Sequence, residues 1–272
     1  MDLAKAIAFG ACHPEIPMEK YLTYEVSTEG LSHLPVVTIP TNPMSSSETN
    51  ADVQITLDES KVQVGCSVGF ASFTWLNPEY VMSLPVSVLV KGQMTVFVQT
   101  FCNYLNRYRS ILAEHYAEAS MKTVLSCLRT VIKDPQNVDA RGTLMLNSAL
   151  SLSGIHDLGR EIDFVPYPLQ SFAQRYLGLS YPEALTGLFP YWLQTIYSAS
   201  EEKEILKEAI SALKSLYKEF GIATAYKELR KDPKDRARLE GIIASFGPMQ
   251  SQFLELTTGK LADIIEIAIA GE

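Results

Sequence analysis

The pattern of apolar and polar residues changes near residue 84 of the chain. Before that point, apolar residues recur at every second position in short runs, which is typical of strands. The exception is the first segment, residues 1–12, which has a helical pattern. The predicted strands are a buried strand at 35–40, a hairpin of 52–57 and 61–66 around Asp58-Glu59-Ser60, and a strand at 70–76.

After Pro85 the apolar residues follow a period of 3.6 to the end of the chain, which predicts helices. The segment 147–193 is too apolar for a surface and is expected at the centre of a helical bundle. We therefore predict a mainly α protein, with a residual Rossmann-like α/β portion at 1–84 and an all-helical domain at 85–272. The predicted helices are 86–107, 109–132, 137–154, 163–178, 182–199, 202–220, 234–246 and 258–270.

Composition and charge narrow the possible partners. The chain has 272 residues, is 47% hydrophobic and carries a net charge of -8. This charge argues against nucleic acid or an anionic membrane surface as a partner. No apolar run reaches the ~20 residues that span a bilayer, and the first residues do not resemble a signal peptide. The four cysteines are scattered, so we expect reduced thiols in a cytoplasmic protein.

Several local motifs resemble those of one enzyme family. The start, MDLAKAIA, resembles the second half of G-G-G-S-x-x-D-x-A-K-A-I-A, and TNPMSSSE resembles P-x-T-x-G-T-G-S-E without its glycines. The segment from Leu76 to Leu105 resembles L-D-P-x-x-x-x-x-L-P followed by G-x-x-D-A-F-x-H-x-x-E-x-Y. These motifs are those of the iron-containing alcohol dehydrogenases, in the NADPH-dependent butanol dehydrogenase branch. The resemblance implies a dehydroquinate synthase-like fold.

The same resemblance implies where a cofactor would bind. Asp2 and Lys5 fall in the helix that follows the family's phosphate-binding turn, and Ser47 and Glu48 fall in the second Gly-rich loop. The glycine half of the first motif would precede Met1, so either the chain begins after it or the front is missing from the sequence. The second loop has no glycine, and glycine permits positive φ and close approach to a ligand. An ordinary Ser-rich surface loop is therefore favoured, and no cofactor is expected, although the family uses iron or zinc and NAD(P).

The four positions that hold the metal in the family are replaced by neutral residues. They fall on Thr95 and Gln99, four apart in one predicted helix, and on Ser171 and Tyr181. Iron and zinc prefer imidazole and carboxylate ligands, and a tyrosine with a pKa of ~10 is a poor substitute. We therefore expect no metal and no catalytic residues. A displaced site built from Asp163, Glu183 and His156 is less favoured, because His156 is expected in a loop as a capping or surface residue.

Three functions remain open. The favoured one is a non-catalytic protein that acts by binding or assembly. The alternative is an NAD(P)-dependent alcohol or aldehyde oxidoreductase whose cofactor-binding front half is missing from the sequence or supplied by another chain. The third is a binder of an apolar small molecule. If Met1 is the true start, the remaining sheet would expose an edge, and a homo-oligomer or a heteromeric partner is then expected over residues 1–84.

Overall fold

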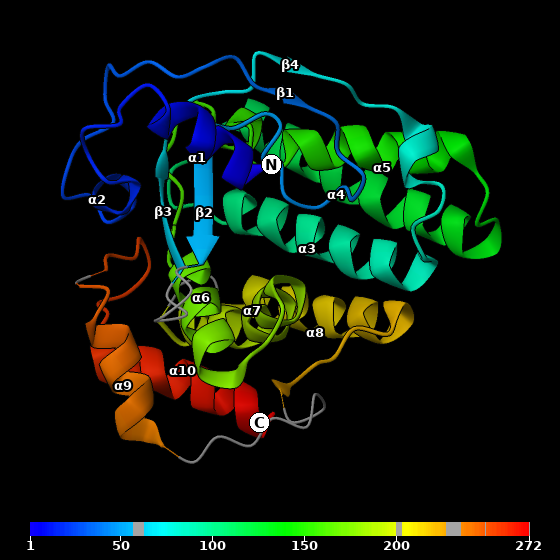
Figure 1. Ribbon diagram of the computed structural model, residues 1–272. Helices are drawn as coiled ribbons and strands as arrows, with labels where there is room; N and C mark the ends of the chain where they lie inside the picture. The colour runs from blue at the N-terminus through cyan, green and yellow to red at the C-terminus, as the bar shows by residue number, and fades with distance from the viewer. Residues whose placement is uncertain (57–62, 200–202, 227–234, 248, 272) are drawn as a thin grey trace. The chain divides into compact units, whose positions relative to one another are not determined.

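The computed structural model describes residues 1–56, 63–199, 203–226, 235–247 and 249–271 (Figure 1). Its strands precede the first long helix, α3 (Val86–Tyr104), and helices dominate the chain from there on. The predicted fold class, mainly α with a partial α/β portion, is confirmed. Within the described residues, no helix combines the length and the hydropathy that crossing a membrane requires.

The chain forms two compact units, residues 1–100 with 110–159 and residues 101–109 with 160–272. All described strands lie in the first unit, together with α3 up to Thr100 and the next two helices. The change from strands to helices therefore falls near residue 84, as predicted, but the two compact units divide the chain elsewhere. Spatial proximity, rather than secondary-structure type, groups α3 to α5 with the strands.

The strand-containing part of the first unit has a small core of its own. It comprises α1 (Asp2–Gly10), α2 (Met18–Leu22), and two separate two-stranded sheets. In one sheet β1 (Val37–Thr38) pairs in parallel with β4 (Phe73–Thr74), and in the other β2 (Asp52–Thr56) pairs antiparallel with β3 (Gln63–Ser67). Phe9, Tyr21 and Val53 pack with Cys66 between α1, α2 and the β2–β3 pair.

The helical part of the first unit contains α3, α4 (Ile111–Lys133) and α5 (Val138–Leu150), with 3₁₀ turns η1 (Pro78–Val81) and η2 (Ile155–Asp157). A buried arginine joins η1 to α5. Arg141 donates from Nη1 to Val81 O at 2.5 Å and to Leu84 O at 3.0 Å, and from Nε to Pro135 O at 2.9 Å. Backbone carbonyls thus solvate a charge that burial would otherwise destabilise.

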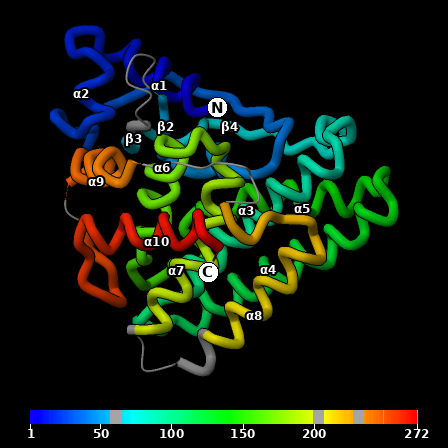
Figure 2. Tube along the Cα trace, turned by 90° about the horizontal axis from the view of Figure 1, so that it is seen from below, coloured from blue at the N-terminus to red at the C-terminus, as the bar shows by residue number. Residues whose placement is uncertain are grey.

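The second unit is built around α7 (Tyr181–Ala199). The other helices are α6 (Pro166–Leu177), α8 (Lys203–Phe220), α9 (Arg236–Ala244) and α10 (Thr258–Ala270). Helices α6, α8 and α10 all contact α7, and Figure 2 shows α10 in red beside it. Phe189 and Trp192 of α7 are fully buried, as expected for the most apolar stretch of the sequence.

Most predicted elements are present with shifted ends. The strand predicted at 70–76 is reduced to Phe73–Thr74, and α2, η1 and η2 were not predicted. The predicted hairpin turn at Asp58-Glu59-Ser60 lies outside the described residues. His156 was expected to have a capping or surface role, but it does not lie at the surface. Its ring is buried in η2, and its Nδ1 lies 3.3 Å from Ser151 O.

Candidate functional site

The four residues assigned to cofactor binding, Asp2, Lys5, Ser47 and Glu48, lie together in the first unit. Lys5 of α1 is only 2% exposed. Its Nζ donates to Ser47 O at 2.9 Å, to Asn50 O at 3.1 Å and to Asp52 O at 2.5 Å, and lies 3.4 Å from Asn50 Oδ1. The ammonium group therefore binds three carbonyl groups of the backbone that leads from the serine-rich loop into β2. Burial lowers the pKa of Lys5, while Asp2, Asp52 and Glu48 act in the opposite direction.

Asp2 makes a second connection between the same segments. Its Oδ1 accepts a hydrogen bond from Ser47 Oγ, and its Oδ2 accepts one from the backbone N–H of Gln54 at 2.9 Å. The first turn of α1 is thus bonded both to the loop and to β2. A carboxylate near a helix N-terminus is also favoured by the helix dipole.

Ser46 holds the loop to the other side of the unit. It is fully buried and has a φ of 54°, in the left-handed region that glycine normally occupies. Its Oγ lies 2.5 Å from Ser148 O and 2.9 Å from Ala149 O, and it accepts from the backbone N–H of Leu152 at 3.0 Å. These carbonyls end α5, where helices leave such groups without intrahelical partners.

The loop is therefore not the ordinary surface loop that the sequence favoured, because Ser46, Ser47 and Glu48 are all buried. Its missing glycines are also weaker grounds against a ligand than the sequence suggested. Ser46 falls at a glycine of the family motif and has the positive φ that a glycine would supply. The motif alignment marked this position, but the residue type gave no sign of the conformation.

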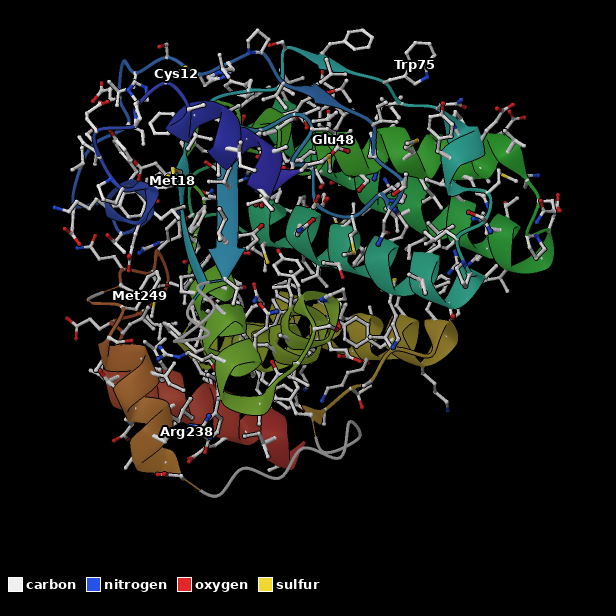
Figure 3. All side chains as sticks on the ribbon, in the orientation of Figure 1. Cys12, Met18, Glu48, Trp75, Arg238 and Met249 are labelled. Carbon is white, nitrogen blue, oxygen red and sulfur yellow. The ribbon has the colours of Figure 1, made fainter. Side chains whose placement is uncertain are left out.

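Glu48 carries a buried carboxylate. Its side chain is 3% exposed, and neither carboxylate oxygen has a hydrogen-bond partner among the described residues. Its backbone O accepts from Thr74 Oγ1 at 3.1 Å, so the residue is held at β4 while its side chain lies near α1 (Figure 3). Burial raises the pKa of Glu48, and the residue's own backbone N–H group and the positive charge of Lys5 oppose this only in part.

Two of the predicted metal positions lie on α3 in the first unit. Thr95 is fully buried, and its Oγ1 donates to Lys91 O at 2.9 Å. Gln99 is 1% exposed, and its Oε1 accepts from Ser151 Oγ at 3.3 Å. Both side chains therefore take part in internal hydrogen bonds, and neither supplies an anionic or imidazole donor.

The other two positions, Ser171 of α6 and Tyr181 at the start of α7, are half-buried in the second unit. They too offer neutral oxygens. Within the ranges that the structure describes, no group of three or more His, Cys, Asp or Glu side chains could hold a metal ion. The donor set at the four positions does not fit iron or zinc.

The displaced set of Asp163, Glu183 and His156 is engaged elsewhere. Asp163 accepts from Ser251 Oγ at 2.7 Å and from the backbone N–H of Val165 at 3.2 Å. At the start of α7, Glu183 accepts from the backbone N–H of Ser180 at 3.2 Å, a capping contact, and from Ser180 Oγ at 2.7 Å. His156 belongs to the first compact unit and the two carboxylates to the second. These contacts explain all three residues as structural.

Several known proteins are similar to this chain in sequence, although no protein-family model matches it. The NADPH-dependent aldehyde reductase YqhD of Escherichia coli is 23% identical in an alignment 248 residues long that covers 82% of this chain and 63% of that protein. The NADH-dependent butanol dehydrogenase A of Clostridium acetobutylicum is 22% identical in an alignment 258 residues long that covers 86% of this chain and 65% of that protein. The chain thus spans less than two thirds of the length of either relative.

Solved structures share the fold. The NADH-dependent butanol dehydrogenase A of Thermotoga maritima superimposes with a TM-score of 0.90 at 19% identity, covering 98% of this chain and 73% of that one. A structure described as an iron-containing alcohol dehydrogenase gives 0.79 at 20% identity, covering 100% and 72%. The sulfoacetaldehyde reductase of Bifidobacterium kashiwanohense, solved in complex with NAD+, gives 0.78 at 18%, covering 100% and 74%.

These comparisons overturn one expectation from the sequence. We expected no cofactor, but the relatives are named as NADPH- and NADH-dependent enzymes, and one structure of the same fold holds NAD+. That expectation rested on the missing glycines, but Ser46 has a positive φ without being a glycine. In sequence and in fold, this chain is related to the iron-containing alcohol dehydrogenases, as its motifs predicted.

Proposed function

We propose that this protein binds a nicotinamide adenine dinucleotide but has lost metal-dependent alcohol or aldehyde chemistry, so that it acts as a binding protein. The observation that carries the second half is the chemistry of the four family metal positions. Thr95 and Gln99 are buried and bonded internally, and Ser171 and Tyr181 add only neutral oxygens. A divalent ion would gain no charged ligand at any of them.

The positive φ at Ser46 and the hydrogen bonds that hold the loop support the first half of the proposal. The NAD(P)H dependence of the named relatives gives the class of ligand. In this chain Lys5 and Asp2 hold the loop from one side and Ser46 holds it from another, while Thr41 and Ser45 are exposed. Bound there, the dinucleotide would supply hydride chemistry. The residues of this chain would orient its phosphates and ribose through small hydroxyl groups and backbone N–H groups.

A direct test uses the purified chain without added metal. NADPH and NADH are titrated by nucleotide fluorescence, the metal content is measured by elemental analysis, and turnover is tested with butanol and butyraldehyde. We expect saturable nucleotide binding, substoichiometric iron and zinc, and no turnover. Absence of nucleotide binding would refute the cofactor half, and about one equivalent of bound metal would refute the other half.

Turnover that appears only when a second protein is added to that assay would instead support the alternative, an NAD(P)-dependent oxidoreductase completed by another chain. This alternative has one observation in its favour, since the named relatives are reductases and dehydrogenases and extend well beyond the aligned region. Turnover is therefore also measured with a cell extract added and again after the extract is removed. Turnover only in the presence of the extract supports the completed oxidoreductase, and no turnover in either case supports the binding protein.

Assembly remains part of the proposal, and the β1–β4 pair supports it. Val37 pairs with Phe73 in register, and these side chains, with those of Ile39 and Trp75 two positions on, are more than half exposed. Thr38 and Thr74 point to the opposite face, where their hydroxyl groups lie 2.8 Å apart. Parallel sheets normally cover both faces, so we expect an oligomer in light scattering and a monomer after Trp75→Lys with Phe73→Lys.

A further inference from the structure

Lys5 occupies an unusual place for a lysine. Its ammonium group is buried and bonded chiefly to backbone carbonyls that are 42 to 47 residues away in sequence. The three backbone acceptors, on Ser47, Asn50 and Asp52, follow one another along the segment that leaves the serine-rich loop. An ammonium group has three donors on a single atom, so one group can serve three converging carbonyls.

We propose that Lys5 is a positioning residue that fixes the shape of residues 46–52 for the dinucleotide without touching the dinucleotide itself. This inference rests on the proposed cofactor binding, but the shape of the segment is measurable without any cofactor. It reassigns Lys5, which the sequence motif placed among the cofactor contacts, to a role inside the protein. The assignment follows from its burial, because a side chain 2% exposed presents almost no surface to a ligand.

The rest of the segment shows what Lys5 would control. Ser46 O accepts from the backbone N–H groups of Thr49 at 2.9 Å and Asn50 at 3.2 Å, which closes a tight turn. Ser46 itself is in the left-handed region, and such a conformation persists only when its surroundings hold it. Lys5 binds directly after this residue, at Ser47 O, and again at Asn50 O. Its three bonds therefore secure both sides of the turn.

Other side chains could not make the same contacts. Arginine would keep the charge, but its planar fork directs donors along fixed lines rather than toward three carbonyls around one point. Methionine would fill a similar volume while leaving three carbonyls without a donor. These two substitutions therefore separate volume, charge and donor geometry. Lys20 of α2 is exposed and provides a matched lysine control.

The first measurement is hydrogen exchange of the cofactor-free protein. In K5M the amides of Thr49 and Asn50 should exchange about tenfold faster or more, since their turn loses its support. Amides in the middle of α7 should not change, and K20M should match the parent throughout. Unchanged exchange at Thr49 and Asn50 in folded K5M would overturn the proposal.

The second measurement is NADPH titration of the same variants. We expect the Kd to rise about tenfold or more in K5M, because the bound shape of the loop is then less populated, and to stay unchanged in K20M. If the parent itself binds no NADPH, the proposed cofactor function fails, while the exchange experiment still decides whether Lys5 holds the loop. Faster exchange without weaker NADPH binding would show that the held shape is irrelevant to the ligand and would overturn the positioning role.

The K5R variant tests whether the positive charge of Lys5 alone accounts for its role. A role that depends only on positive charge would be fully rescued by arginine, so parent-like exchange and affinity in K5R would overturn the proposal. We expect K5R to fold and to show both defects at reduced size. If K5M fails to fold, K5R carries both measurements against K20M.

Discussion

The serine-rich loop and the predicted metal positions of α3 both differ from the residues of the motifs that they resemble, but with different consequences. In the loop, Ser46 replaces a glycine and still has a φ of 54°. On α3, Thr95 and Gln99 keep helical positions four apart, yet their side chains have turned to internal hydrogen bonds. The loop has a positive φ at Ser46 without a glycine, whereas the predicted metal positions offer only neutral side chains.

The difference has a simple physical origin. A backbone conformation depends on the total energy of the segment, so hydrogen bonds from Ser46 to the end of α5 can offset the strain of a side chain at positive φ. Metal coordination depends on the ligand atoms themselves, and no neighbouring contact turns an amide or a hydroxyl into an imidazole. Loss of a glycine is therefore weaker grounds for loss of function than loss of a ligand.

The largest expected effect on stability comes from a side chain at position 46 that disfavours a positive φ. Ser46→Val adds β-branching at a positive φ and removes the hydroxyl that serves the carbonyls of Ser148 and Ala149. Strain and lost hydrogen bonds together should lower the free energy of unfolding by about 3–4 kcal/mol. Urea denaturation measures this change. The control is Ser45→Val at the exposed neighbouring position, which should change stability by less than about 0.5 kcal/mol.

A somewhat smaller loss of stability should follow from placing a metal-ligating side chain on α3. Thr95→Asp places a carboxylate at a fully buried position and removes the hydrogen bond to Lys91 O, at a cost of about 2–3 kcal/mol. Adding Gln99→His gives two donors on one helix face. Zinc should then raise the melting temperature of the double variant in a concentration-dependent way, and not that of the parent. Equal melting of the double variant with and without zinc would show that these positions do not share a face open to an ion.

The sequence predicted the helical part better than the loop, for reasons that these residues illustrate. A long periodic pattern reports burial directly, so the helix predicted at 258–270 has the same ends as α10. A five-residue helix such as α2 is too short to show a period, and it was missed. The motif marked Lys5 and Ser47, but their bond joins residues 42 apart. Neither the burial of Glu48 nor the positive φ of Ser46 has a local signature, because both arise from packing against distant segments.

Glu48 offers a gain of stability rather than a loss. No described residue donates a hydrogen bond to its buried carboxylate oxygens, so Glu48→Gln should raise the free energy of unfolding by about 1–2 kcal/mol at pH 7. The pKa of Glu48 is raised above its ordinary value of 4.5, so the fold favours the protonated form. That contribution is complete below pH 4.5 and is lost as the pH rises through the folded-state pKa. Thermal unfolding measured over a range of pH should show that the variant does not lose this stability as the pH rises. The same loss in the variant as in the parent would show that another group causes it.

A matched comparison is Asp163 in the second unit, whose pKa burial also raises but whose oxygens accept from Ser251 and Val165. Asp163→Asn should lower stability, because an amide nitrogen would face one of these donors. Opposite signs for the two substitutions would show that the donors around a buried carboxylate, and not its burial alone, decide its effect. Equal signs would contradict the absence of donors at Glu48.

The smallest effect is expected from restoring the family's own residue at the loop. Ser46→Gly relieves the strain at a φ of 54°, but it removes the hydroxyl bonds to the end of α5 and increases the freedom of the unfolded chain. Thr49 Oγ1 still donates to Ala149 O, and Ser151 Oγ still donates to Ser148 O at 2.9 Å, so both carbonyls keep a partner. These opposing terms should leave a net loss of less than about 1 kcal/mol, measured by urea denaturation beside Ser46→Val. Because glycine keeps the left-handed backbone, NADPH affinity should stay at the parent value, and a marked loss of affinity would show that the hydroxyl group itself, rather than the shape it supports, serves the nucleotide.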